Sequence, residues 1–226
     1  MAYNRGDSKQ IIVGAAALFV SKTTEFDPTN VSPALPDFVA GTAYRETLST
    51  TGAGVVRNVG YTMNGLEIQF QPDFGEVKVD QLLDVAKLYK QGMTVNLNTA
   101  FAEATLENLL VAVAASSNDL AKDVKMDNPL EVGSVNYADV MDIKSGELGE
   151  CPVERGLIAV GPGTGDCAAG SSIERIYVAY RALSIENVTV SAKRDEASMF
   201  EVSFRLLPAN NGSYGKIVDR LVPSSA

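Results

Sequence analysis

Histidine is absent from this chain of 226 residues, and tryptophan is absent as well. Without histidine the chain cannot form a Ser-His-Asp or Cys-His catalytic group, nor a zinc or iron site with imidazole ligands. Its two cysteines are too few for a four-cysteine metal site. Carboxylate pairs and lysines remain as chemical groups for catalysis. The sequence therefore predicts a protein that is not an enzyme and has no cofactor or metal, with a carboxylate-based enzyme as a less favoured alternative.

The two cysteines, Cys151 and Cys167, lie sixteen positions apart and do not form a CxxC motif. In a reducing cytosol both are expected to be free thiols. The alternative is one disulfide that closes the glycine-rich loop between them, which requires a geometry that spacing alone does not test.

Basic residues are also scarce, since 19 lysines and arginines stand against 28 aspartates and glutamates and give a net charge of −9. Such an acidic chain is a poor candidate for tight binding to a nucleic-acid backbone or an anionic membrane. The longest apolar run, residues 11–20, is about half the length that a membrane-spanning helix needs. Asp7 before this run and Lys22 after it argue against a signal peptide, so a buried strand is the favoured interpretation.

Length and composition indicate one globular domain over residues 1–226, with 46% hydrophobic and 21% charged residues. Residues 1–9 are polar and resemble an arm. Residues 21–41 contain three prolines and form a long connection, a kind of loop that is often functional or ordered by a partner.

Two segments alternate strictly between apolar and polar residues, which predicts strands with one polar face. The polar positions of residues 66–71 and 93–98 are Glu67, Gln69, Gln71, Thr94, Asn96 and Asn98. Asn64-Gly65 between the runs 55–63 and 66–71 predicts a hairpin turn of type I′. Residues 72–75 predict a further turn.

Helical spacing predicts helices over residues 79–91, ended by Gly92, and over residues 101–115, capped by Thr99. Strands are expected in most of the rest: across residues 42–79, in short pieces of 116–150, and at 157–160, 173–191, 199–207 and 213–218. The predicted fold class is mainly β (α+β), an antiparallel β-sandwich or barrel with a flanking α-helix.

This order of pieces resembles the major tail protein, or tail tube protein, of tailed bacteriophages. The resemblance rests on the apolar start at residues 11–16, the proline-rich loop and the hairpin around Asn64-Gly65. It also rests on the phrase FGEVKVDQLL at residues 74–83, the Ala/Leu helix and the closing phrase FEVSFRLLP at residues 200–208. It covers most of the chain as a pattern of elements.

The resemblance implies a structural virion protein that self-assembles into hexameric rings, which stack into a tail tube. Strands of all six subunits would line the inner barrel, and DNA would pass through it as a non-specific passenger during ejection. The implied partners are further copies of the chain, the tape measure protein, the baseplate, the tail terminator and, in contractile phages, the tail sheath. Synthesis in the host cytoplasm, localisation in the virion and no membrane association are implied as well.

Three sets of residues are candidates for these roles. The candidates that face the lumen are Glu67, Gln69, Gln71, Thr94, Asn96 and Asn98. The candidates for contacts between subunits or rings are Arg5, Asp7, Lys9, Glu25, Asp27 and Asp37. The hairpin turn is assigned to Asn64 and Gly65. The alternative function is a monomeric decoration or binding module on a virion or cell surface, which predicts a closed polar surface with a ligand pocket.

Overall fold

Antiparallel strands dominate the computed structural model, which describes residues 12, 14–22, 25, 26, 37, 39, 42–80, 84–127, 135–144, 151–163, 171–186, 188–190, 194 and 198–223. The strands are β1 (Ala17–Ser21), β2 (Val56–Asn58), β3 (Thr62–Lys78), β4 (Val85–Phe101), β5 (Leu120–Asp127), β6 (Val135–Met141), β7 (Arg155–Pro162), β8 (Ser171–Ser184), β9 (Phe200–Leu207) and β10 (Gly215–Pro223). The helices are α1 (Tyr44–Thr50) and α2 (Leu106–Ala112), with short 3-10 helices η2 (Thr51–Gly54) and η3 (Ser117–Asp119). The fold is mainly β with two α-helices, which confirms the predicted fold class.

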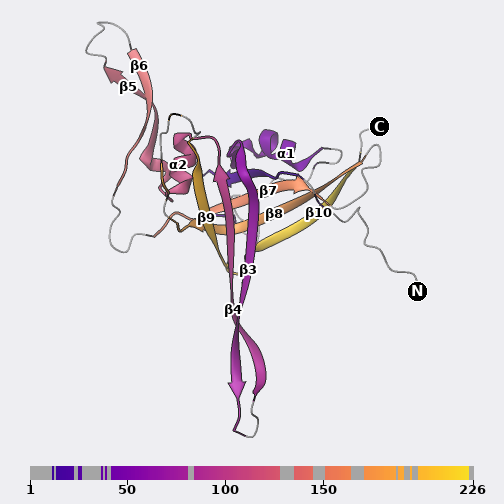
Figure 1. The fold of residues 1–226 in the computed structure, drawn as a ribbon. Coiled ribbons are helices and arrows are strands. Elements are labelled where there is room, and N and C mark those ends of the chain that lie inside the picture. Colours follow the sequence, from indigo (N-terminus) through magenta and orange to yellow (C-terminus); the bar gives the residue numbers. More distant parts are fainter. Residues whose placement is uncertain are drawn as a thin grey trace.

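One eight-stranded sheet forms the body, with strand order β2-β1-β7-β8-β9-β4-β3 and with β10 also paired to β8. The sheet divides at β8, because residues 171–179 pair with β10 and residues 181–184 pair with β9, while β7 pairs along the other edge. The two ends of the strand path, β2 and β3, are joined by residues 59–61, whose backbone bonds to β1 and to the residue after β4. The sheet thus folds into two layers, β1-β7-β8-β10 and β3-β4-β9, which cross steeply in Figure 1.

The inner core lies between these two layers. Phe101 of β4 and Phe204 of β9 are at its centre, with ring centroids 6.4 Å apart and side chains at most 2% exposed. Leu18 and Val20 of β1 enter it from the opposite layer, and Leu110 of α2 covers one end. Burial of these large apolar side chains is the main term that stabilises the two-layer arrangement.

A second, outer cluster lies on the other side of the β1-β7-β8-β10 layer, under α1. Phe19 of β1 packs there with Tyr44 and Leu48 of α1. The carboxylate of Glu174 on β8 accepts the Tyr44 backbone N–H at 3.1 and 2.9 Å, and Nη1 of Arg220 on β10 donates to the same carboxylate at 3.0 Å. A helix as short as α1 is marginal by itself, so this burial and the buried carboxylate at its first residue hold it in place.

Asn64 and Gly65 form a bulge within β3, and the prediction of a hairpin turn at these residues is wrong. Both have a positive φ, 64° and 71°, as a type I′ turn also requires. Their neighbours Met63 and Leu66 nevertheless pair with adjacent positions of β4, so the two residues have no counterpart across the ladder. The physical reason is strand pairing. β3 pairs with β4 on both sides of these two residues, and β2 pairs with β1 instead of with β3.

Replacing Gly65 with valine will destabilise the folded chain more than the same replacement at Gly92. An added Cβ meets no atom within 4 Å at either position, but only Gly65 has a positive φ. Valine at such a φ is strained, so we expect the free energy of unfolding to fall by about 1–3 kcal/mol for Gly65→Val. Urea denaturation of both variants measures the difference. Equal losses at the two positions would contradict an origin in the backbone of the bulge.

The ladder of β3 and β4 contains two segments for which the sequence predicts other structure. They are residues 72–75, predicted as a turn, and residues 85–91, predicted within a helix over 79–91. β4 continues past Gly92, which was expected to end that helix. Of the connection between the strands, residues 81–83 lie outside the described residues. An isolated helix of this length is marginal in water, whereas β4 pairs with β3 along most of its length, so strand pairing overrides the helical spacing.

α2 confirms the predicted helix over residues 101–115 only in its central part. Thr105 caps it, because its hydroxyl accepts the backbone N–H of Asn108 at 3.2 Å. The predicted cap at Thr99 is wrong, since Thr99 lies in β4 and its side chain donates to the Gly65 carbonyl at 3.0 Å. The sequence does not predict α1, and the strands expected from residue 42 onward begin only with β2.

The remaining strand predictions are confirmed, one of them only in part. β1 lies in the apolar run near the start, and β5 and β6 are the short strands expected between residues 116 and 150. The strands predicted at 157–160, 199–207 and 213–218 correspond to β7, β9 and β10. The strand predicted at 173–191 corresponds to β8 only as far as Ser184, since the described residues among 185–190 are not in a strand.

Candidate assembly surface and cavities

The six residues predicted to face a lumen lie on one face of the β3–β4 ladder. Directly opposite one another across the two strands are Glu67 and Asn98, Gln69 and Asn96, and Gln71 and Thr94. Opposed residues of an antiparallel pair point to the same side of the sheet. The other side carries the apolar positions, which enter the inner core. The alternation within each strand is visible in the sequence, whereas the register that unites the two sets comes from tertiary pairing.

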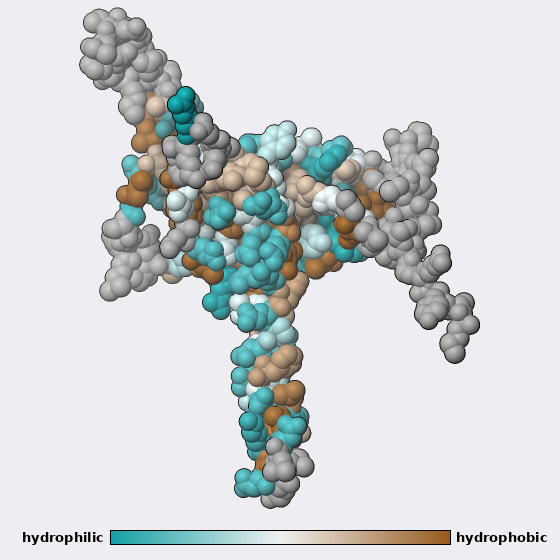
Figure 2. Space-filling view, viewed as in Figure 1, coloured by the Kyte–Doolittle hydropathy of each residue, from teal (hydrophilic) through white to brown (hydrophobic). Residues whose placement is uncertain are grey.

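β9 extends this surface by a third strand. Ser203 lies opposite Asn98 and donates its Oγ proton to Asn98 Oδ1 at 2.8 Å, and Arg205 lies opposite Asn96. Asn96 Oδ1 is buried and has no hydrogen-bond partner among the described residues. Figure 2 shows mainly hydrophilic colours over the centre of the body, where β9, β4 and β3 cross it. We call the following set the polar face: Glu67, Gln69, Gln71, Thr94, Asn96, Asn98, Ser203 and Arg205.

One edge of β3 borders the polar face and has no strand partner in the described parts of the chain, because β3 ends the strand path. β3 spans 17 residues, so this edge offers a long row of backbone N–H and C=O groups. Unpaired edges of this kind accept a further strand from another chain. Interruptions along β3 include the bulge at Asn64 and Gly65 and the missing N–H of Pro72, and the ladder with β4 shifts register twice more, between Asp73 and Phe74 and between Val77 and Lys78.

The distal part of the β3–β4 hairpin projects beyond the body as a two-stranded ribbon (Figure 1). We call residues 70–79 and 84–93 the β3–β4 ribbon. Phe70, Phe74 and Leu88 of this ribbon are 57%, 54% and 59% exposed. Phe70 and Phe74 share a face by the strand period of two, and Leu88 lies diagonally across from Phe74. This exposed row continues the side of the ladder that is buried nearer the body, and Glu76 and Lys90 lie on the same side, opposite Leu88 and Phe74.

On the opposite face of the ribbon Gly75 is covered by neighbouring side chains, whereas Val77 and Tyr89 are 41% and 46% exposed. Gln91 Nε2 donates to the Tyr89 hydroxyl at 3.0 Å, and a Cβ added to Gly75 would lie 2.5 Å from Gln91 Nε2 and 2.6 Å from Tyr89 Cζ. A two-stranded ribbon is marginally stable in isolation, and a row of exposed aromatic and aliphatic side chains is typical of an interaction surface. The ribbon therefore exposes large apolar side chains on both faces among the described residues, with the row of Phe70, Phe74 and Leu88 on one of them.

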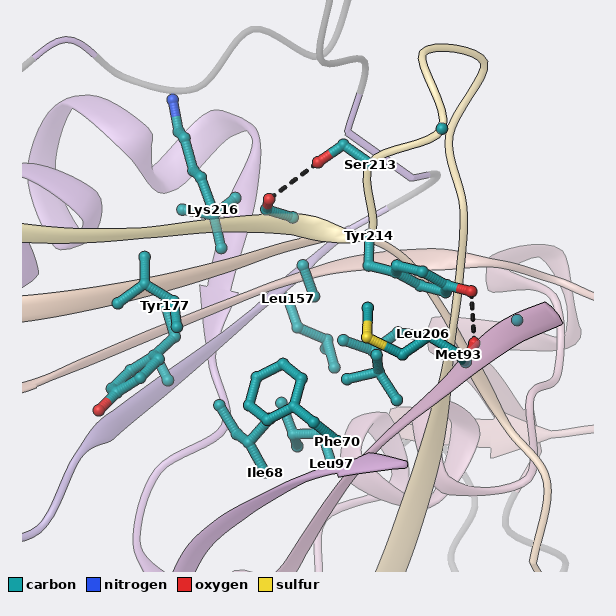
Figure 3. A pocket seen from close by; sticks show the side chains of 18 of the residues that line it. Ile68, Phe70, Met93, Leu97, Leu157, Tyr177, Leu206, Ser213, Tyr214 and Lys216 are labelled. Atoms are coloured by element: carbon teal, nitrogen blue, oxygen red, sulfur yellow. Dashed lines mark hydrogen bonds between the residues drawn. The ribbon is translucent and has the colours of Figure 1, made fainter. Parts of the chain in front are cut away.

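A cavity of about 570 Å³ opens where the two layers diverge (Figure 3). Ile68 and Phe70 form part of one wall, and residues of β8, β10 and the segment before β10 form the other. The Tyr214 hydroxyl donates to the Met93 carbonyl at 2.5 Å and links the two walls. The charged residues among the described lining are two lysines, so a catalytic pair of carboxylates would have to lie elsewhere.

A second cavity, of about 330 Å³, lies beside α2, and most of the charged side chains that line it are basic. Lys22, Arg57, Lys122 and Arg155 line it together with one acidic residue, Glu107, and we call it the cationic cavity. Glu107 is shared, because its carboxylate contacts Arg57 Nε at 3.2 Å and also pairs with Lys122. The hydrogen bond from Lys122, followed by the charge of Arg57, lowers the pKa of Glu107 against the opposing effect of burial.

Arg155 is 4% exposed and makes its hydrogen bonds to the backbone. Nη1 donates to the carbonyls of Ser21 at 3.3 Å and Lys22 at 2.8 Å, and Nη2 donates to the carbonyl of Ala115 at 3.1 Å. Burial lowers the pKa of Arg155, and the charge of Arg57 lowers it further. An arginine nevertheless stays protonated in proteins, so this is a buried positive charge without a carboxylate partner among the described residues.

The residues predicted to contact other subunits are described only in part. Outside the described residues are Arg5, Asp7, Lys9 and Asp27. Glu25 and Asp37 are exposed. Burial, followed by the charge of Asp37, raises the pKa of Tyr44 to about 12. Cys151 carries a free, exposed thiol, and Cys167 lies outside the described residues.

Neither α1 nor α2 has the length and hydropathy that a helix needs to cross a membrane. Within the described ranges, no three side chains of His, Cys, Asp or Glu converge as metal ligands would. Comparisons with the models of known protein families and with curated proteins find no match for this chain.

Proposed function

We propose that this chain is a structural protein that assembles into hexameric rings, which stack into the tail tube of a bacteriophage. The observation that carries the proposal is the polar face beside the unpaired edge of β3. Six positions chosen from sequence as lumen candidates share this one sheet face. A sheet that must line a wet channel needs this arrangement of polar residues on one side and core residues on the other.

Edge-to-edge joining of copies would place their polar faces around a common axis. The unpaired edge of β3 supplies main-chain groups for such a joint. The resulting wall would combine amide and hydroxyl groups with few charges, such as Glu67 and Arg205. Together with the net charge of −9, this composition favours weak and non-specific contact with DNA passing through.

The β3–β4 ribbon supports a second contact, between one ring and the next. Its exposed row of Phe70, Phe74 and Leu88 extends away from the body and would be buried against a neighbouring copy. In such a tube the tape measure protein would fill the channel before ejection, and the baseplate and tail terminator would meet the two ends. A sheath would surround the tube in a contractile tail.

Negative-stain electron microscopy of the concentrated, purified chain tests the proposal. We expect six-fold rings or hollow rods with a central channel, and sedimentation velocity should show a matching large species that grows with protein concentration. A chain that remains monomeric in both measurements at every concentration tested would count against it.

A monomeric decoration or binding module is the second candidate, and the cavity of about 570 Å³ favours it. This volume is within the range of small-molecule pockets, and its walls are mainly apolar with a few polar groups, as in many ligand sites. Such a module would be expected to close its surface, whereas this chain leaves a long strand edge and an apolar row uncovered in its described parts. The tube proposal accounts for both of these features.

A further inference from the structure

We propose that the cationic cavity binds a small oxyanion. The cavity is separate from the polar face and the β3–β4 ribbon, and the inference does not depend on the tail-tube proposal. It rests on three features of the described residues: an excess of positive charge, buried donors without acceptors, and a rigid support for the arginines.

The cavity has an excess of positive charge, whereas the net charge of the whole chain is negative. Four basic residues line the cavity against one glutamate, in a protein whose net charge is −9. Glu107 is already divided between Arg57 and Lys122. Glu103 and Asp139 also act on Arg57 and Lys122 from outside the lining. Arg155, however, donates to backbone carbonyls and Lys22 has no carboxylate at bonding distance in the described structure, so the positive charge of these two residues remains without compensation. Buried charges are normally paired because burial without a partner costs free energy.

Three buried polar atoms around the cavity lack a hydrogen-bond partner in the described structure. They are Ser21 Oγ, Arg57 Nη2 and Arg155 Nε, and all three residues line the cavity. More than nine in ten buried polar groups in proteins have a partner, so three exceptions at one place call for a common explanation. The two guanidinium atoms can only donate, and the hydroxyl can donate as well. The missing partner is therefore an acceptor, and the basic lining favours one with negative charge, such as a phosphate or carboxylate oxygen.

The arginines are held in place before any ligand arrives. Arg57 Nη1 donates to Asn108 Oδ1 at 2.8 Å, and Asn108 is fully buried. Asn108 Nδ2 in turn donates to the carbonyls of Val59 and Glu103, each at 2.8 Å. Arg155 is fixed by its bonds to backbone carbonyls at both ends of its guanidinium group. Such a support lowers the entropy cost of binding, because the donors need not be ordered by the ligand.

The oxyanion can be free in solution or can be a carboxylate on a second copy of the chain. Both sources offer oxygens of the same chemistry to the same donors. The lining residues come from β2, α2, η3, β5 and β7 and from the end of β1 and the residue after it, so a bound oxyanion would connect segments far apart in the sequence. Binding to the folded state alone should therefore stabilise the whole chain.

Isothermal titration of the full chain with inorganic phosphate tests the site, at constant ionic strength maintained with sodium chloride. Arg155→Gln removes the buried guanidinium group, and Lys22→Gln removes an exposed charge at the cavity without touching a core contact. Lys125→Gln is the matched control, since it makes the same change at an exposed residue of β5 that does not line the cavity. Thermal unfolding in chloride alone establishes that each variant is folded before its titration is interpreted.

We expect phosphate to bind the unaltered chain and the Lys125→Gln variant with the same affinity. Arg155→Gln and Lys22→Gln should each weaken binding by about tenfold or more, as the loss of a charge-assisted hydrogen bond or of a close charge predicts. Phosphate also stabilises proteins by exclusion from their surface, so a rise in melting temperature counts only where it differs between cavity variants and control. No measurable binding, or equal binding by all four proteins, would overturn the inference.

Sedimentation velocity with and without phosphate then identifies the source of the oxyanion. If a carboxylate of another copy occupies the cavity, phosphate will compete with it and reduce self-association, and Lys22→Gln will weaken self-association in chloride. If the oxyanion comes from solution, phosphate will bind and leave the association state unchanged. Because the titration reads binding directly, failure of the tail-tube proposal would leave its result intact.

Discussion

Aspartate at both Phe74 and Leu88 will keep the chain monomeric under conditions in which the unaltered chain forms rings or tubes. These side chains lie diagonally across the two strands on one face of the β3–β4 ribbon and are more than half exposed. Burying a phenylalanine and a leucine contributes about 3–6 kcal/mol per contact, and two carboxylates would remove that gain and resist desolvation. Sedimentation velocity and negative-stain microscopy at matched concentrations measure the loss.

The same double variant should fold as well as the unaltered chain. Substitutions at exposed positions usually change the free energy of unfolding by less than about 0.5 kcal/mol each. Ile143→Asp is the matched control, because Ile143 is 94% exposed and lies outside the ribbon. We expect this control to assemble normally. Normal tubes from the Phe74→Asp, Leu88→Asp chain would remove the ribbon from the assembly surface.

Phe204→Ala will strongly destabilise the monomer. Phe204 is 2% exposed and packs against Phe101 between the two layers, with ring centroids 6.4 Å apart. Replacing a fully buried phenylalanine with alanine costs about 3–5 kcal/mol, from lost apolar burial and from the cavity that remains. Denaturation in urea, with the midpoint and slope fitted together, measures the change in free energy of unfolding.

Phe70→Ala provides the comparison for this core substitution. This substitution removes the same side-chain atoms as Phe204→Ala, but Phe70 lies on the ribbon and is 57% exposed. Its cost to the monomer should be well below that of Phe204→Ala, because little apolar area is removed from the core. Similar losses for the two variants would mean that the inner core does not depend on the contact between β4 and β9.

These two experiments separate assembly from folding, and the separation follows from one structural feature. A single ladder, β3 with β4, supplies the inner core near the body and an uncovered apolar row at its far end. The same alternating pattern therefore stabilises the monomer in one half of the hairpin and is available to a second copy in the other half. The polar face runs along the opposite side of the part of the ladder nearer the body.

Local sequence pattern was sufficient for the strands whose faces differ in polarity. Alternation over residues 66–71 and 93–98 predicted strands with Glu67, Gln69 and Asn96 on their polar sides, and all of these positions lie on one sheet face. The pattern could not supply the register between the strands, since opposed pairs such as Glu67 and Asn98 are set by long-range pairing. The central part of α2 was predictable for the same local reason, its apolar stripe.

Where local signals conflicted with long-range pairing, pairing prevailed. Asn64 and Gly65 have the positive φ that their sequence favours, but they form a bulge and not a hairpin turn, because β3 continues along β4. Residues 85–91 have helical spacing and still form a strand for the same reason. α1 is short and lacks a strong pattern, so its contacts with Glu174 and the outer cluster decide its structure.

The cationic cavity could not be predicted from local sequence. Lys22, Arg57, Lys122 and Arg155 are distributed over more than half of the chain and share no spacing that would mark them as a group. By itself the sequence determined that the protein is rich in strands, acidic, without histidine chemistry, and equipped with polar strand faces, because these properties depend on composition and on neighbours along the chain. The folding of the sheet into two layers, the projection of the ribbon and the meeting of four distant cations were decided only by tertiary contacts, which no segment can specify alone.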